Sequence, residues 1–446
     1  MDRQEFARRR RQFMRMIGKD AIAVLPAAPV RHRNGDIEYA YRQDSQFHYL
    51  AGFPEPDAVA VLVPGRPHAE YLLFVREHDA LRESWDGEWA GPEGAVERYG
   101  ADDAFPIADI DEILPGLMEQ RSRIFYSMGT HLEFDTRMLG WVNGMRVHAR
   151  QGAGVPQEFV ALGHVLDDMR LYKSRGEQGK LRRAAQIAIG AHRRAMRFVR
   201  PGRMEYEVMA EILHEFRSHN ADISYHPIVG GGANACVMHY RANDQKLRDG
   251  ELLLLDAGCE HDYYASDITR TFPVNGRFTP AQRAVYEVVL EAQLAAIDKV
   301  RPGNHWNEPH EAAVRAITHG LVALGLLKGK PSRLIKEQAY LPFFNHRTGH
   351  WLGLDVHDVG DYKVGGEWRV LEPGMALTVE PGLYIRPAPR VPREFWNIGA
   401  RIEDDVLVTA DGHQLLTARL PRSVDQVEKV MAEGRTAPRA SAAGGN

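Results

Sequence analysis

The stretch LLLLDAGCEHDYYASDITRTF, residues 252–272, decides how the second half of the chain is expected to fold. Its apolar run ends in Asp256, and such a run is typical of a strand that is buried on both faces. Gly258 permits a turn, and DITRTF predicts a returning strand that begins at Asp267. We therefore expect the two aspartates to meet across a hairpin.

A second pair of acids follows the same pattern later in the chain. The apolar run MALTV leads into Glu380, and Pro381 directly after it ends the ladder pairing, as expected at a functional strand end. The run IEDDVLV predicts another strand, with Glu403 near its start. Arg401 shares a face with Glu403, so we expect it to orient that carboxylate.

An internal repeat relates these two pairs. The tetrapeptide VRPG occurs at residues 199–202 and again at 300–303, each time after one long helix and before another. The helices that follow are predicted over about 205–218 and 308–324. The later residues match in order, with a histidine and then two acids: His239, Asp256 and Asp267, and then His350, Glu380 and Glu403. The pattern predicts a pseudo-twofold domain in which each half supplies two carboxylates to one centre.

Four converging carboxylates need compensation. An ionised carboxylate in an apolar strand costs several kcal/mol unless it is paired, and four close together would not all ionise. Two divalent cations would bring four positive charges against four negative ones. Ion pairs are the alternative, but only Arg270 and Arg401 lie in these strands, so they could neutralise part of the charge at most. The set of acids therefore favours metal binding.

The segment HRTGHWLGLDVHDVG, residues 346–360, adds three histidines within twelve residues. In an extended segment His350 and His357 would point to opposite faces. From the pattern alone, either could be the nitrogen ligand of a metal.

The length of 446 residues predicts two domains. Ser174 and Glu177 fit a capping box that opens a long helix, so we place the boundary near Tyr172. Residues 1–172 alternate strands, such as 58–63 and 71–75, with helices, such as 109–120. The tail, residues 434–446, has the composition of a disordered segment.

Composition excludes several function classes. The net charge is −4, which gives no electrostatic footprint for nucleic acid or an anionic membrane. Two cysteines suggest a reducing, cytoplasmic location. The arginine-rich start, residues 8–14, predicts a basic surface helix rather than an export signal, because Lys19 and Asp20 interrupt the apolar run that follows.

These motifs resemble the pita-bread metallopeptidases, which include methionine aminopeptidase, prolidase and aminopeptidase P, and most of all the aminopeptidase P enzymes. The resemblance extends over nearly the whole chain, since YRQDSQFHYLAGF, residues 41–53, is similar to the N-terminal domain of those enzymes. It implies an α/β (α+β) protein with a creatinase-like N-terminal domain, residues 1–172, and a pita-bread catalytic domain, residues 173–433.

The resemblance also implies a set of ligands. Asp256 would chelate one metal, His350 and Glu380 the other, and Asp267 and Glu403 would bridge both.

Other residues would act on the substrate by the same resemblance. His239 and His357 would contact substrate or handle protons, and Glu380 would also carry a proton towards the leaving proline nitrogen. Supporting roles are implied for four further residues: His346, Arg401, Tyr384 and Trp85. The last would reach a neighbour's active site in a homo-oligomer, a tetramer or a dimer.

The implied reaction is removal of the first residue from peptides with proline in second place, by a hydroxide bridging two metals. An oxygen-rich ligand set with one imidazole favours Mn²⁺, with Co²⁺ or Zn²⁺ possible. A prolidase that cuts X-Pro dipeptides would share every ligand. A non-catalytic binding homologue, or a metal-free relative such as creatinase, is disfavoured by the intact ligand set.

Overall fold

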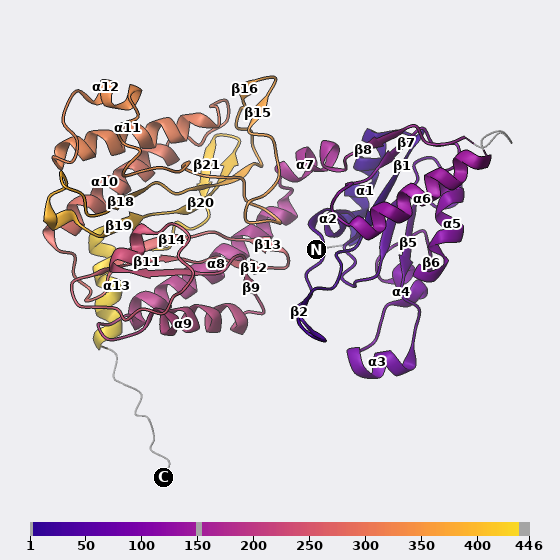
Figure 1. Cartoon of the computed structure of the whole chain (residues 1–446), viewed down its shortest axis with the longest axis horizontal. Coiled ribbons are helices and arrows are strands. Elements are labelled where there is room, and N and C mark those ends of the chain that lie inside the picture. Colours follow the sequence, from indigo (N-terminus) through magenta and orange to yellow (C-terminus); the bar gives the residue numbers. More distant parts are fainter. Residues whose placement is uncertain (1–2, 149–153, 437–446) are drawn as a thin grey trace, which may run out of the picture. The chain divides into compact units, whose positions relative to one another are not determined.

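The computed structural model describes residues 3–148 and 154–436 (Figure 1). Backbone contacts divide the chain into two compact units, Met1–Met169 and Arg170–Asn446. The division falls close to the boundary expected near Tyr172 and just before the capping box. No helix in the described ranges is long and apolar enough to cross a membrane.

Unit 1 is built on a six-stranded sheet. Its strand order is β6-β5-β4-β1-β7-β8, in which β4 is antiparallel to β1 and β5, and the outer pairs are parallel. The strands are β1 (Ala21–Pro26), β4 (Val59–Leu62), β5 (Tyr71–Val75), β6 (Asp103–Pro106), β7 (Arg123–Phe125) and β8 (Glu158–Val160). The strands predicted over 58–63 and 71–75 are β4 and β5, and the helix predicted over 109–120 is α5 (Ile110–Met118).

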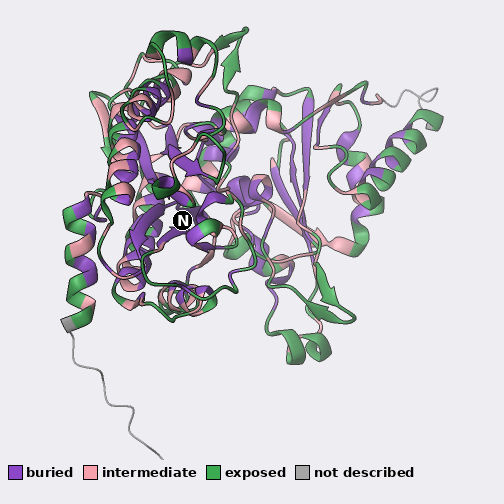
Figure 2. Ribbon diagram, turned by 60° about the vertical axis from the view of Figure 1, so that its left-hand side comes forward, coloured by how far each residue is buried: buried purple, intermediate pink, exposed green. Residues whose placement is uncertain are grey.

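Helices and a hairpin complete unit 1. They are α1 (Arg3–Ile17), α2 (Ser45–Ala51), α3 (Ala80–Asp86), α4 (Gly91–Glu97), α6 (Leu132–His148), α7 (Gly163–Leu171), and the hairpin of β2 (His32–Asn34) with β3 (Ile37–Glu38). Figure 2 shows the central strands of the sheet, β1, β4 and β5, buried and the hairpin and α3 exposed. Trp85 lies on α3 and is 83% exposed.

Helix α1 corrects one prediction. It was expected to be a basic surface helix, and Arg8 and Arg11 are exposed, but Arg9 and Arg10 are buried. The Arg10 guanidinium lies over the ring of Tyr71, 3.9 Å from its centroid, and donates to the carbonyl oxygen of Leu50 at 2.9 Å. The long arginine stems and planar head groups let these cations pack against rings and carbonyl groups.

Unit 2 consists of two halves, each with a core of its own. The first half contains α8 (Arg175–Phe198), α9 (Glu205–Ser218), and a sheet of β10 (Ile228–Gly231), β11 (Leu252–Asp256) and β14 (Thr269–Pro273). The second contains α10 (Pro280–Ile297), α11 (Asn307–Ala323), α12 (Pro331–Lys336), and a sheet of β17 (Ala376–Val379), β20 (Asp404–Thr409) and β21 (Gly412–Leu415). In Figure 1 the strands lie between α10 and α11 on one side and α8 and α9 on the other.

The VRPG repeat recurs as a repeated backbone geometry. Gly202 and Gly303 both have positive φ, 93° and 87°. The amide of Gly202 donates to the carbonyl of Leu247 at 2.8 Å, and that of Gly303 donates to the carbonyl of Leu371 at 3.0 Å. Glycine is needed at both turns, because an L side chain rarely adopts this conformation.

Helix starts in unit 2 follow the sequence signals. Ser174 and Glu177 form the predicted capping box of α8, and Thr279 caps α10 with Pro280 at its first position. At the other end, α13 (Val424–Thr436) continues past residue 434, so the tail predicted to start there is helical at first. The rest of that predicted disordered tail, residues 437–446, lies outside the described residues.

The link between β11 and β14 is more elaborate than the predicted hairpin. The two strands do pair antiparallel, with Asp256 opposite Thr269. Between them, however, β12 (Cys259–His261) pairs with both β13 (Tyr264–Ala265) and β9 (Asp222–Ile223) in a separate small sheet. Asp267 therefore lies just ahead of β14 rather than within it. In the second half, β18 (Gly382–Ile385) and β19 (Ile398–Arg401) pair with each other.

Candidate metal centre

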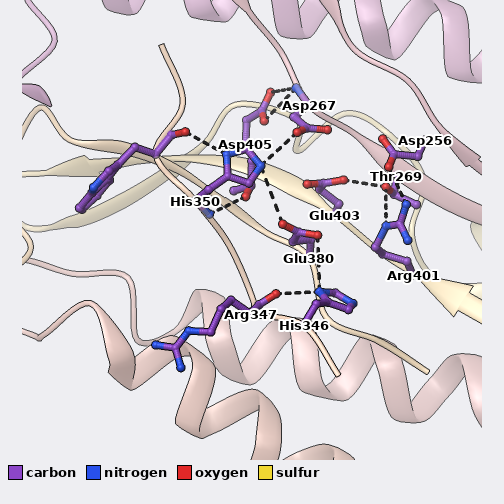
Figure 3. Close-up of polar contacts among 12 residues, drawn as sticks. Asp256, Asp267, Thr269, His346, Arg347, His350, Glu380, Arg401, Glu403 and Asp405 are labelled. Atoms are coloured by element: carbon purple, nitrogen blue, oxygen red, sulfur yellow. Dashed lines mark hydrogen bonds and ion pairs between the residues drawn. The ribbon is translucent and has the colours of Figure 1, made fainter. Parts of the chain in front are cut away.

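The five predicted ligands line one pocket of about 510 Å³ in unit 2. They come from both halves of unit 2. Asp256 ends β11, Asp267 precedes β14, Glu380 follows β17, and Glu403 joins β19 to β20, whereas His350 lies in the segment between α12 and β15 and its backbone carbonyl accepts from the amide of Thr378 in β17. The acids thus lie where regular pairing stops, and their side chains converge in Figure 3.

Three of these residues are close enough to hold one ion. Donor atoms of Asp267, His350 and Glu403 all lie within 4.8 Å of one another. Nε2 of His350 is 3.2 Å from Oδ2 of Asp267 and 3.8 Å from Oε1 of Glu380.

The backbone orients His350 for this position. Its Nδ1 lies 2.9 Å from the carbonyl oxygen of Trp351, which can only accept, so Nδ1 carries the hydrogen. Nε2 then faces the carboxylates, where its lone pair would be free for a metal ion once the ring is neutral. The ring of His357 packs edge-on against that of His350, with centroids 4.3 Å apart. The geometry therefore favours His350 over His357 as the nitrogen ligand.

If all four carboxylates were ionised, they would carry more negative charge than Arg401 and His350 could offset. Burial raises the pKa of Asp256 and of Glu403, and it raises the pKa of Glu380 to about 7. Burial alone would lower the pKa of His350, but Asp267 and Glu380 outweigh it and raise the value to about 9. Acids that resist ionisation in such a cluster fit a site built for divalent cations, which remove the mutual repulsion.

Arg401 is bonded differently from the prediction. Its Nη2 donates to Oδ2 of Asp256 at 2.5 Å, Nε donates to Oγ1 of Thr269 at 3.1 Å, and Nη1 donates to the hydroxyl of Tyr384 at 2.9 Å. The carboxylate that it was expected to orient, Glu403, instead accepts from the Thr269 hydroxyl at 2.6 Å. Arg401 therefore orients Asp256 directly and Glu403 through Thr269.

Tyr384 and His346 extend this chain of hydrogen bonds. The Tyr384 hydroxyl lies 2.9 Å from Nε2 of His346, whose Nδ1 lies 2.7 Å from the carbonyl oxygen of Arg347. Burial, with Arg401 nearby, lowers the pKa of His346 to about 3, so its ring is neutral. The His346 ring donates from Nδ1 to the carbonyl of Arg347 and accepts at Nε2 from the Tyr384 hydroxyl. Oε2 of Glu380 lies 3.8 Å from Nδ1 of His346.

The remaining predicted residues fall in two places. His239 and His357 line the pocket and have no hydrogen-bond partner in the part of the chain that the structure describes. Burial, followed by the charge of His350, lowers the pKa of His357. Trp85 belongs to unit 1.

Tyr225 is a site residue that the sequence reasoning missed. Its hydroxyl oxygen lies 2.5 Å from Oδ1 of Asp256 and 2.6 Å from Oδ1 of Asp267. Burial and the two aspartates raise its pKa well above the usual value. No local sequence signal marked it, because its place depends on the pairing of β10, which begins three residues later, with β11, where Ile228 lies opposite Asp256.

Asp405 and Asp404 were also missed. Asp405 accepts from the backbone amide of Asp267 at 3.2 Å, which fixes the chain at that ligand. Asp404 binds Arg270 at 2.6 Å, and both side chains are 0% exposed. Arg270, considered above as a neutraliser of the ligands, is thus committed to Asp404 and to the carbonyl oxygen of Glu403, 2.6 Å from its Nη1.

Comparisons with known proteins agree with the two-unit architecture. Residues 179–410 match the model of metallopeptidase family M24, and residues 6–126 match that of the aminopeptidase P N-terminal domain. The chain is 43% identical to the Xaa-Pro aminopeptidase of Escherichia coli (strain K12), over 98% of this chain and 99% of that one. It is 35% identical to Xaa-Pro aminopeptidase 3 of Rattus norvegicus, over 96% of this chain and 85% of that one.

Solved structures give the same picture. The structure of the Pseudomonas aeruginosa aminopeptidase PepP is 56% identical with a TM-score of 0.97, covering 98% of this chain and 99% of that one. Zn-substituted E. coli aminopeptidase P in complex with product is 43% identical with a TM-score of 0.95, covering 98% and 100%. The predicted fold class, a creatinase-like domain followed by a pita-bread catalytic domain, is confirmed.

Proposed function

Because this chain belongs to metallopeptidase family M24, and within it to the aminopeptidase P enzymes, we propose that it removes the first residue from peptides whose second residue is proline. The observation that carries the proposal is the pocket that gathers Asp256, Asp267, His350, Glu380 and Glu403. Similarity to enzymes named Xaa-Pro aminopeptidase supports the choice of substrate. The five pocket residues support metal-dependent hydrolysis as the reaction.

The donor set fits two divalent cations. Three buried carboxylates, the partly exposed carboxylate of Glu380 and one imidazole offer oxygen-rich coordination, which on hardness favours Mn²⁺, with Co²⁺ or Zn²⁺ able to substitute. When bound, such a pair would supply the attacking nucleophile by lowering the pKa of a water molecule towards neutrality.

The chain's own residues would prepare and complete the reaction. Arg401 and Tyr225 hold the two oxygens of Asp256, so that this carboxylate has one orientation. Glu380 would hold the proton released by the nucleophile and deliver it to the proline nitrogen as the bond breaks. His239 and His357, on the pocket wall, would donate hydrogen bonds to the carbonyl oxygen that becomes negative.

Proline in second place explains the need for such a site. The prolyl nitrogen carries no hydrogen, and its ring fixes the backbone. A general peptidase that binds the amide hydrogen has nothing to hold at this bond.

The decisive experiment compares three peptides with the metal-loaded protein: Ala-Pro-Ala, Ala-Pro and Ala-Ala-Ala. We expect release of free alanine from Ala-Pro-Ala only. Cleavage of Ala-Pro alone would assign a prolidase instead. Asp267→Ala, which removes a proposed bridging ligand, is the matched control and should abolish activity; wild-type turnover in that variant would contradict the two-metal site.

We also propose a homo-oligomer, a tetramer or a dimer, in which Trp85 acts near a neighbour's active site. The exposure of this large aromatic side chain, 83%, supports a role in contact with another molecule. Light scattering should give an oligomer, and Trp85→Ala should raise KM while the oligomer persists. A monomer with full activity would contradict this proposal.

A further inference from the structure

Glu205 begins α9 and is completely buried, with 0% of its surface exposed. It lies against the segment between β10 and β11, residues 232–251. That segment carries three residues that line the pocket: Met238, His239 and Arg241. Glu205 itself is not among the pocket-lining residues, so any effect on the site must pass through this segment.

The carboxylate accepts four hydrogen bonds from the segment and its edges. Oε1 accepts from the backbone amide of Gly231 at 2.7 Å and from Nδ2 of Asn234 at 3.1 Å. Oε2 accepts from the hydroxyl of Tyr240 at 2.8 Å and from the backbone amide of Gln245 at 2.9 Å. All four donors come from outside α9, and together they fill the accepting capacity of the group.

Within the described residues no lysine, arginine or histidine forms an ion pair with Glu205. A buried carboxylate without a cation is stable only if hydrogen bonds replace its hydration, and these four donors do so. Gly231 and Tyr240 are partly buried and Gln245 is exposed, so the carboxylate ties these three donors to the buried start of α9.

The four anchors flank His239 on both sides. Gly231 and Asn234 precede it, and Tyr240 and Gln245 follow it. His239 makes no hydrogen bond in the part of the chain described here, so its position is set by the backbone on either side. The nearest anchor, Tyr240, is its direct neighbour in the chain.

The repeat shows that the backbone alone does not require this carboxylate. Glu205 donates its amide to the carbonyl of Gln245 at 3.0 Å, and Trp306 donates its amide to the carbonyl of Arg369 at 2.9 Å, at the matching place in the second half. Trp306 holds its surroundings by packing on Trp351, with ring centroids 4.1 Å apart. The same turn therefore forms with an aromatic residue in place of the acid. The role of Glu205 thus lies in its hydrogen bonds to residues 231–245 and not in forming the turn.

We propose that Glu205 is a positioning residue that clamps residues 231–245 and so holds His239 towards the metal centre. This inference rests on the proposed function, in which His239 contacts the substrate. Misplacement of a reacting or stabilising group by about 1 Å can lower a rate by about 100-fold. A clamp of this kind therefore affects turnover without touching substrate or metal.

Glu205→Gln is the direct test. The amide keeps the size of the side chain. Its NH₂ group, however, replaces an oxygen that accepts two hydrogen bonds, so two donors are left facing a third donor. We expect wild-type metal content, faster hydrogen exchange confined to residues 231–245, and a fall in kcat/KM of about 10- to 100-fold, mainly in kcat.

Glu207→Gln is the matched control, in the same turn of α9. Its carboxylate binds Arg203 and the amide of Met204 and makes no contact with the clamped segment. It should leave both kcat and the exchange of residues 231–245 unchanged.

A double-mutant cycle separates positioning from general damage. If Glu205 acts through His239, Glu205→Gln should have almost no further effect on kcat in a His239→Ala background. An equal loss in both backgrounds, or wild-type exchange of residues 231–245 in Glu205→Gln, would overturn the proposal. If Glu205→Gln does not fold, Tyr240→Phe takes its place in the cycle, with an expected loss of about fivefold.

The two proposals fail separately. If the wild-type protein does not cleave Ala-Pro-Ala, the proposed function fails, and the exchange measurement still decides whether Glu205 clamps the segment. If the wild type is active and His239→Ala is as active as the wild type, the clamp has no catalytic purpose and the inference is overturned.

Discussion

Arg401 and Asp256 lie 2.5 Å apart, Nη2 to Oδ2, and they join the end of β19 in one half of unit 2 to the end of β11 in the other. Both side chains are buried. The Arg401 guanidinium therefore donates to one oxygen of Asp256, a proposed metal ligand, and offsets its negative charge. The orientation of Asp256 thus depends on residues from both halves of unit 2.

Arg401→Lys tests whether this geometry matters beyond charge. Lysine keeps the positive charge but cannot reach Asp256, Thr269 and Tyr384 together from one planar group. We expect kcat to fall about 10- to 100-fold, as for other partners that orient metal ligands. Steady-state kinetics with metal analysis would check this, with the exposed Arg333→Lys as control; an unchanged kcat would mean that charge alone suffices.

His350 should be needed for metal binding, whereas His357 should be needed only for the rate of the reaction. Because Nε2 of His350 faces Asp267 at 3.2 Å, His350→Ala should lose bound metal and activity together. His357→Ala should keep its metal and lose rate. Metal content after dialysis, measured alongside kcat, separates the two; metal loss in His357→Ala with retention in His350→Ala would reverse the assignment.

The buried pair of Asp404 and Arg270 should matter for stability. Asp404→Asn would leave a fully buried guanidinium without its counter-ion, which typically costs about 3–5 kcal/mol. Because Arg270 also binds the carbonyl of Glu403, the variant should bind metal more weakly. Urea unfolding and metal titration would test both effects; Asp411→Asn, in an exposed turn of the same sheet, should change neither.

Stability should fall in mild acid partly because of His192. This histidine of α8 is buried, its Nε2 donates to the carbonyl of Ala257 at 3.0 Å, and its Nδ1 has no partner among the described residues. Burial lowers its pKa to about 4. The unfolded chain, with a histidine pKa near 6.5, therefore takes up a proton that the folded chain refuses between about pH 6.5 and 4.

The free energy of unfolding should consequently decline across that window, by up to about 3 kcal/mol from this residue. His192→Gln keeps a donor for Ala257 but has no such titration. Urea unfolding of both proteins from pH 8 to 4 would check it. The wild type should lose stability relative to the variant below about pH 6.5; a constant difference would show that His192 does not titrate in this way.

The sequence predicted well which acids line one pocket, because an acid at the end of an apolar strand is costly enough to need a reason. It also predicted helix starts, since the caps at Ser174 and Thr279 depend on neighbours within three residues. The backbone geometry at Gly202 and Gly303 followed from the repeated tetrapeptide in the same way. In each case the physical cause lies within a short stretch of chain.

What escaped prediction depends on contacts between distant segments. Tyr225 acts on Asp256 and Asp267 only because a loop returns beside β11, and no local pattern records that path. The burial of Arg9 follows from packing against a ring and a carbonyl group that α2 supplies, at Tyr49. The direct partner of Arg401 was misassigned, because the alternation of side chains along a strand predicts which residues share a face but not which residues of other strands lie next to them.

The helix α13 has a consequence for how the protein matures during synthesis. Val427, Val430 and Met431 belong to the core of the first half, together with residues of α8 and α9. That core therefore lacks three of its buried side chains until α13 has been synthesised, although Asp256 and Asp267 are made much earlier. A nascent chain thus carries these two acids on a scaffold whose core is still incomplete.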